Sequence, residues 1–238
     1  MIQGLLEAID NAPLSLVADA PQPENETAAE FKFVHDRIQQ AAYSLIPDRE
    51  KPAAHWRMGQ LLLQHVPAEQ REDRIFSIVN QLNAGAALAN TSAERWQVAE
   101  LNLLAGKKAK TAAAWESAFD YLKTGIGLLE EGDWAERYPL ALALYEDTAE
   151  AAYLNKNFDF MEQLAEAVSH HAQSVLDQVK VYEIRIQAAM ARNDPLKAIA
   201  IGLEILKPLG MRFPEKPNQW HILVAFLRTR WAWIGKTY

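Results

Sequence analysis

Apolar residues recur at helical spacing through most of the chain after Pro47, and short polar breaks separate the runs. Residues three and four apart share one face of a helix, so this pattern predicts a succession of amphipathic helices. The breaks between them are brief, which favours helical hairpins and a mainly α fold. We place helices at residues 51–66, 70–89, 93–109, 112–130, 137–154, 158–173, 175–192, 195–209 and 218–234.

Residues typical of helix ends support this division. Thr91 and Glu94 have the spacing of a capping box, in which each residue bonds to the backbone of the other. Asp194 precedes Pro195 as an N-cap precedes a first-turn proline. Two glycines stand where we expect helices to end: Gly132 and Gly210.

A weak internal repeat is visible in the second half of the chain. The sequence AAYLNKNF at 151–158 aligns with AAMARNDP at 188–195, a separation of 37 residues. An earlier copy is less regular, because residues 130–138 lengthen its connection. The period exceeds the tetratricopeptide length of about 34 residues. We therefore expect tetratricopeptide-like hairpins stacked into an α-α superhelix, each burying one face against its neighbour. In the helix at 175–192 the expected buried residues are Val175, Val179, Tyr182, Ile186 and Ala189.

The N-terminal part contains one junction of a different kind. The alternation FKFV favours a brief strand at residues 31–34, and a helical pattern follows over residues 36–46. The chain thus passes from strand to helix at His35. This junction resembles the winged-helix segment of STAND-type signalling ATPases, in which a hydrophobic-His-Asp motif begins a helix facing the nucleotide pocket. The matching residues are Val34, His35 and Asp36.

Further stretches are similar to one family of large bacterial sensor kinases. In that family a Ser/Thr kinase domain, a STAND-type ATPase, a helical-repeat region, a GAF domain and often a histidine kinase share one polypeptide. The resemblance covers most of the chain after Phe31. The matching stretches are residues 33–47, then His55, Met58, Gly59 and residues 61–63, and residues 77–85, 99–110, 114–129, 144–154 and 209–217.

The helical pattern and the resemblance together divide the chain into three parts. Residues 1–48 form a winged-helix-like segment, and residues 49–217 form the helical-repeat domain. We expect residues 218–238 to be the truncated start of a further hairpin. For residues 1–30 two interpretations stay open: they complete the wing, or they are a disordered leader.

The resemblance implies a non-catalytic module that relays or senses a signal between an ATPase switch and a kinase output. Its partners would be the adjacent ATPase and kinase domains of the parent protein, and other signalling proteins. His35 would contact a nucleotide phosphate only together with the upstream ATPase domain, and Asp36 would cap its helix. The chain contains no G-x-x-x-x-G-K-[ST] motif. We therefore expect no cofactor held by this chain alone, and no catalysis by it.

Composition bears on the alternative functions. The net charge is −7, from 24 basic and 31 acidic residues, which argues against a surface for nucleic-acid phosphates. The alternative is a winged-helix DNA-binding regulator with a helical-repeat effector domain, which would place Arg37, Gln39 and Gln40 in a groove. The region around them carries about as many acidic as basic residues, so it ranks second. The chain has no cysteine, which fits a cytoplasmic protein and excludes disulfides and thiolate zinc sites.

Other groups of chemically active side chains offer less. His170 and His171 are adjacent and point about 100° apart on a helix, so we expect no metal site there. Lys107, Lys108 and Lys110 form a basic run, which we interpret as a solvated helix face. No motif fixes a nucleophile, a base or a metal.

The C-terminal segment from Asn218 is apolar and basic. We interpret it as the first helix of a further hairpin, whose packing face would stay exposed and favour a homodimer. A helix lying on a membrane is the weaker alternative. The segment combines Trp220, Phe226, Trp231 and Trp233 with Arg228, Arg230 and Lys236.

Overall fold

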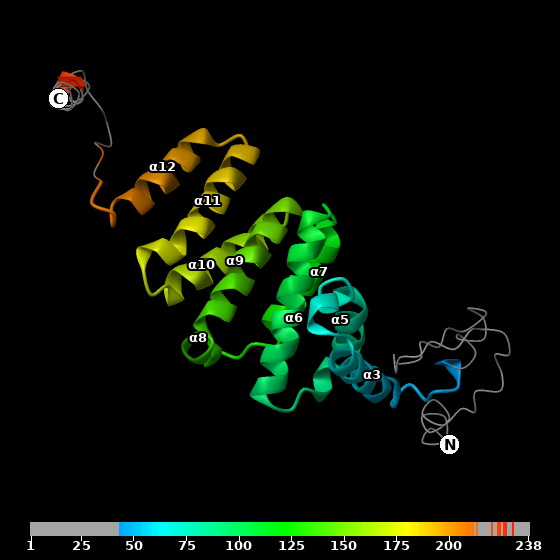
Figure 1. Ribbon diagram of the computed structural model, residues 1–238. Helices are drawn as coiled ribbons and strands as arrows, with labels where there is room; N and C mark the ends of the chain where they lie inside the picture. Colours follow the sequence, from blue (N-terminus) through cyan, green and yellow to red (C-terminus); the bar gives the residue numbers. More distant parts are fainter. Residues whose placement is uncertain are drawn as a thin grey trace. The chain divides into compact units, whose positions relative to one another are not determined.

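The structure, a computed structural model, describes residues 43–211 together with Phe213, Trp220, Leu223, Val224, Phe226, Leu227 and Arg230. Helices joined by turns make up these residues, and no strand occurs in this described part. The predicted mainly α class is confirmed (Figure 1). His35 and most of the predicted winged-helix-like segment, residues 1–48, lie outside the described residues.

The chain divides into two compact units, Met1–Leu101 and Asn102–Tyr238, and helix α6 contributes residues to both. In the first unit the prediction of one helix at 70–89 is wrong, because three shorter helices take its place. Arg74, in a non-helical conformation, separates the first two pieces, and Gly85 ends the second. The elements of this unit are α3 (Lys51–His65), α4 (Ala68–Arg71), α5 (Ile75–Ala84), the 3₁₀ helix η2 (Ala86–Leu88) and the start of α6 (Ser92–Thr111).

Helices α3 and α5 form the core of the first unit. The buried residues of α5 are Ile75, Ile78, Val79 and Leu82. Gly59 of α3 allows the close approach, since a Cβ there would lie 2.6 Å from Leu82 Cδ2. A side chain at Gly59 would therefore force the two helices apart.

Residues 102–206 of the second unit form three hairpins of consecutive helices. The first is the end of α6 with α7 (Trp115–Gly127), the second is α9 (Tyr138–Leu154) with α10 (Phe158–His171), and the third is α11 (Val175–Ala191) with α12 (Pro195–Leu206). The predicted helices in this region are confirmed to within a few residues at their ends. The long connection predicted at 130–138 contains a short helix, α8 (Asp133–Glu136). Gly132 is its N-cap, so the prediction that Gly132 ends a helix is wrong.

The turns inside the three hairpins have the same geometry. Each contains one non-glycine residue in the left-handed conformation: Ala113 (φ 55°), Lys156 (φ 60°) and Asn193 (φ 59°). In each turn the next N–H group donates to a carbonyl five residues back. These bonds are Ala114 to Ala109 (2.9 Å), Asn157 to Ala152 (2.8 Å) and Asp194 to Ala189 (2.9 Å). Lys156 and Asn193 are 37 residues apart, which confirms the repeat seen in the sequence.

The predicted helix caps are confirmed as well. The Thr91 N–H donates to Glu94 Oε2 at 3.0 Å, and the Glu94 N–H donates to Thr91 Oγ1 at 3.2 Å. The Lys197 N–H donates to Asp194 Oδ1 at 3.0 Å. These residues therefore set the starts of α6 and α12.

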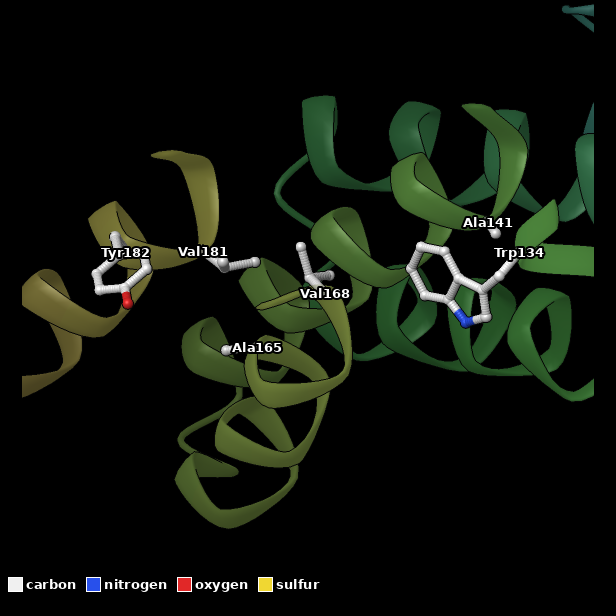
Figure 2. Packing of buried hydrophobic residues seen from close by; sticks show 6 residues of the cluster. All are labelled: Trp134, Ala141, Ala165, Val168, Val181 and Tyr182. Atoms are coloured by element: carbon white, nitrogen blue, oxygen red, sulfur yellow. The ribbon is translucent and has the colours of Figure 1, made fainter. Parts of the chain in front are cut away.

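A hydrophobic core joins the second and third hairpins through α8 (Figure 2). Ala141 of α9 and Ala165 of α10 are small and let neighbouring helices approach closely. The larger Trp134 of α8 and Tyr182 of α11 belong to the same core. The buried members of this core are Trp134, Ala141, Ala165, Val168, Val181 and Tyr182.

The buried face of α11 differs in part from the predicted one. Tyr182 and Ala189 are buried as predicted, but Val179 is 43% exposed. The other buried residues are Val181, Ile184 and Ala188. The buried stripe is rotated, because α9 and α10 cover one side of α11 within the described residues.

The left-handed turn residues give a first prediction. Such a conformation costs a residue with a Cβ roughly 1–2 kcal/mol, and glycine avoids that cost. We expect Ala113→Gly to raise the free energy of unfolding by about 0.5–1 kcal/mol in urea denaturation. The control is Ala112→Gly, one residue earlier, where φ is not positive. That substitution should lower stability by a similar amount, and equal losses in both variants would contradict the argument.

Candidate functional site

The first helices of the three hairpins, α6, α9 and α11, are linked by charged side chains around one buried carboxylate. Asp147 of α9 is only 5% exposed in its side chain. Lys110 of α6 and Lys180 of α11 each place Nζ 2.9 Å from Asp147 Oδ1. Lys107 of α6 lies near the other oxygen, with Nζ 3.5 Å from Oδ2. One carboxylate therefore binds ammonium groups from both neighbouring helices.

A second carboxylate completes this group. Glu150, one turn after Asp147, accepts from Lys110 Nζ at 2.5 Å and lies 3.6 Å from Lys180 Nζ. We call Lys107, Lys110, Asp147, Glu150 and Lys180 the lysine-carboxylate cluster. Its formal charge is +1, from three lysines and two carboxylates.

The pKa values of the cluster follow from competition between burial and pairing. Burial would raise the pKa of Asp147, but hydrogen bonds from Lys180 and Lys110 outweigh it and hold that pKa below its ordinary value. Burial would lower the pKa of Lys180, but the Asp147 carboxylate raises it instead. Both groups are therefore charged near neutral pH. The neighbouring Glu146 has no such hydrogen bonds, and burial raises its pKa.

This chemistry suits structural pairing and surface recognition better than catalysis. A lysine held as an ammonium ion cannot act as a nucleophile or a base. Lys107 is 52% exposed and Glu150 is 34% exposed, so part of the cluster faces solvent. The cluster therefore holds three helices together and presents charge of both signs on the side that they share.

A second polar contact links the start of α9 to the start of α11. Tyr138 Oη donates to Asp177 Oδ2 at 2.5 Å, and the Gln173 N–H donates to Tyr138 Oη at 3.0 Å. Asp177 also forms the capping box of α11 with Ser174. Burial, and then the Asp177 carboxylate, raise the pKa of Tyr138, so its hydroxyl stays protonated as a donor. Helix α11 is thus attached to α9 at two positions.

The candidates from the sequence have varied outcomes. His35 lies outside the described residues, so its role stays a prediction. His171 stacks on Trp134 with ring centroids 4.5 Å apart, and its Nε2 lies 3.1 Å from Glu131 Oε1. Across the described residues, no group of histidine and acidic side chains could hold a metal ion. Nor is any helix of this described part long and apolar enough to cross a membrane.

The lysine-carboxylate cluster is not apparent from the sequence. The interpretation of the basic run as a solvated face is wrong for Lys110, whose side chain is 16% exposed and pairs with Asp147. One sequence signal was present, since Asp147 lies between Leu144 and Ala151 on a helix face whose other residues, including Thr148, carry no charge. A charged residue at such a position needs a partner. The partners are 33 to 40 residues away, beyond what spacing along one helix can indicate.

Comparison with known proteins gives one informative similarity. No family model matches this chain, and no solved structure matches it. The chain is similar to hybrid signal transduction histidine kinase G of Dictyostelium discoideum, with 26% identity over 207 residues that cover 76% of this chain. The chain spans about 6% of the length of that relative. The similarity therefore connects this chain with a small part of a signalling kinase.

Neutralising the buried carboxylate tests the importance of the cluster. Asp147→Asn keeps the shape but leaves Lys110 and Lys180 facing each other without their shared anion. We expect the free energy of unfolding to fall by about 2–3 kcal/mol, less than for a fully buried pair because the lysines are partly exposed. The control Glu146→Gln, one residue earlier, should change stability by less than about 0.5 kcal/mol. Equal effects in urea denaturation would contradict the assignment.

The same variant gives a pH prediction. The folded pKa of Asp147 lies below the ordinary value of 3.8, so the folded chain binds fewer protons than the unfolded chain. The stabilisation is complete above pH 3.8 and is lost as the pH falls through the folded pKa. The stability difference between wild type and Asp147→Asn should therefore stay constant from pH 7 to about 4 and shrink below that. A difference unchanged down to acid unfolding would contradict it.

Proposed function

We propose that this chain is a non-catalytic helical-repeat module that mediates protein contacts within a signal-transducing multidomain kinase. The observation that carries the proposal is the similarity to a hybrid histidine kinase, because it extends over 76% of this chain. The stacked hairpins support it, since arrays of this kind provide extended surfaces for partners. The cluster chemistry, with its paired ammonium and carboxylate groups, also favours recognition over reaction.

The proposed partners are the ATPase and kinase domains of the same signalling protein. A relay of this kind requires two states with different contacts between the array and the partner. The lysine-carboxylate cluster suits the array to this task, because it ties α6, α9 and α11 to one another. A contact with one of these helices would then bias the other two.

The proposed contact surface is the exposed part of the cluster with its acidic neighbours. Lys107 supplies positive charge, while Glu150 and the half-buried Glu146 supply negative charge. A surface with both signs favours a partner of complementary mixed charge, and such contacts weaken with added salt.

The proposal is tested by titrating the full chain with the separately expressed ATPase segment of the parent protein. We expect binding that Lys107→Glu weakens roughly fivefold, equivalent to about 1 kcal/mol for one exposed charge. Lys107 suits this test because its 3.5 Å pairing with Asp147 is the longest of the three lysine contacts to that carboxylate. The control Lys197→Glu reverses an exposed charge on α12 and should bind as wild type does.

Nucleotide provides a further condition in the same titration. Repeating it with ADP and with an ATP analogue asks whether the chain responds to the ATPase state. Binding that depends on the nucleotide, with a dependence removed by His35→Ala, would support a module that senses the switch. Binding indifferent to nucleotide would leave a passive scaffold, and no binding at all would contradict the proposed function.

A further inference from the structure

The third hairpin has a largely apolar side that nothing in the described structure covers, and on α11 the hydrogen-bonded pair Glu183 and Gln187 lies among its apolar residues. Five large apolar side chains on it are exposed by 43–78%. Leu176, Val179 and Met190 belong to α11, and Leu196 and Ile199 belong to α12. We call these five residues the open face. It lies away from α9 and α10, because the residues of α11 buried toward those helices are on the opposite side.

The 37-residue repeat shows which contacts the residues equivalent to the open face make in the preceding hairpin. Subtracting 37 from Val179, Met190 and Ile199 gives Leu142, Tyr153 and Glu162. Leu142 packs against the core that contains Val181 and Tyr182 of the next hairpin, and Tyr153 packs against the one that contains Ile184 and Ala188. Glu162 Oε1 lies 2.8 Å from Arg185 Nη2 of α11. Glu162 therefore pairs directly with the first helix of the following hairpin, and Leu142 and Tyr153 pack against cores to which that helix contributes.

The same comparison shows that the contact expected at the open face is apolar. Where α10 has Glu162 and Glu166, α12 has Ile199 and Leu203. On the opposite side the two helices agree, since Leu164 and Val168 correspond to Ile201 and Ile205. Leu164 and Val168 are buried core residues, and Ile201 and Ile205 pack against the core that joins the second and third hairpins. Helix α12 thus has an apolar inner side like that of α10, but it has aliphatic side chains where the outer side of α10 has carboxylates.

A complementary apolar surface follows on the same chain. Trp220, Leu223, Val224 and Leu227 are helical, are 46–73% exposed, and have the spacing i, i+3, i+4, i+7 of a single helix face. The opposite face of a helix there would hold Ala225, Thr229 and Ile222, and the positions between the two faces would hold His221, Phe226 and Arg228. The sequence predicts one helix at 218–234, and its apolar stripe has the character that the open face requires.

We propose that residues 218–234 form the first helix of a further repeat and cover the open face of α11 and α12. Residues 207–210 form a turn closed by the Met211 N–H donating to the Leu206 carbonyl at 3.0 Å. The connection still permits this placement, because the six residues at 212–217 can span about 20 Å when extended, whereas α12 is about 18 Å long. A segment on such a short connection has an effective concentration on the order of millimolar. The chain's own helix therefore competes well against a second copy at micromolar concentration. This inference does not depend on the proposed signalling function.

Chemical cross-linking of the full chain tests the proposal, and the absence of native cysteine makes the chain suitable. One variant combines Ile199→Cys with Leu227→Cys, and its matched control combines Ile199→Cys with Thr229→Cys. Positions 227 and 229 are only two residues apart in sequence but lie about 160° apart around a helix, on nearly opposite faces. Both variants are treated with a short bis-maleimide, and products are identified by intact mass.

We expect an intramolecular product that forms roughly tenfold faster through position 227 than through position 229, at a rate independent of protein concentration. Equal rates at both positions, or no product, would overturn the proposal. A product that is mainly a dimer and increases with concentration would also overturn it and assign the open face to a second copy.

Hydrogen exchange provides a measurement that needs no cysteine. In the wild-type chain, amides in residues 218–234 should exchange at least about tenfold more slowly than in Ile199→Asp, which places a charge on the open face. Lys197→Asp, on a different side of α12, is the control and should leave that protection unchanged. Exchange that is equally fast in all three proteins would overturn the proposal even if one variant folds poorly.

Discussion

The pairing of one buried carboxylate with lysines from two other helices sets the arrangement of the second unit. Burying a charge costs several kcal/mol unless opposite charges reach it at hydrogen-bonding distance. Lys110 and Lys180 do so, each with Nζ 2.9 Å from Asp147 Oδ1. These two contacts fix the positions of α6 and α11 along the axis of α9. A shift of either helix by one turn, about 5.4 Å, would leave the carboxylate without one partner. The cluster therefore determines how α6, α9 and α11 are aligned with one another when their apolar side chains pack.

The hairpin turns show that tertiary packing also determines local geometry. Asparagine tolerates the left-handed conformation better than most residues, whereas alanine and lysine do not. Yet Ala113 and Lys156 have nearly the same φ as Asn193. The common geometry must then come from what the turns join, namely helices that end and begin at equivalent places. The cost of roughly 1–2 kcal/mol at Ala113 is offset by the contacts of α6 with α7, such as Leu122 against Gly106.

These features explain what sequence could and could not predict. Helix ends with a local chemical signal, such as Thr91 with Glu94 and Asp194, were predictable because caps act within one turn. The break of the helix predicted at 70–89 depends on Gly85, where a Cβ would meet Trp56 Cβ at 2.7 Å. The glycine itself is a local signal of a helix end, but its contact with Trp56 joins residues 29 apart and cannot be read from the local sequence. Asp147 was visible as an anomaly, but its partners were not, because the pairing of helices is decided by packing.

Helices α10 and α12 differ on their outer sides, and this difference influences which hairpin can pack against α11. Arg185 is 12% exposed in its side chain, pairs with Glu162 and lies 5.5 Å from the Tyr182 ring. If α11 stacked on α12 of another copy, Ile199 would replace Glu162, and the guanidinium would lose its carboxylate in a mostly buried position. An unpaired buried charge is costly, so this stacking is disfavoured even though both surfaces are otherwise apolar. The polar pair thus specifies which neighbour α11 accepts, and apolar burial supplies the stability of the contact.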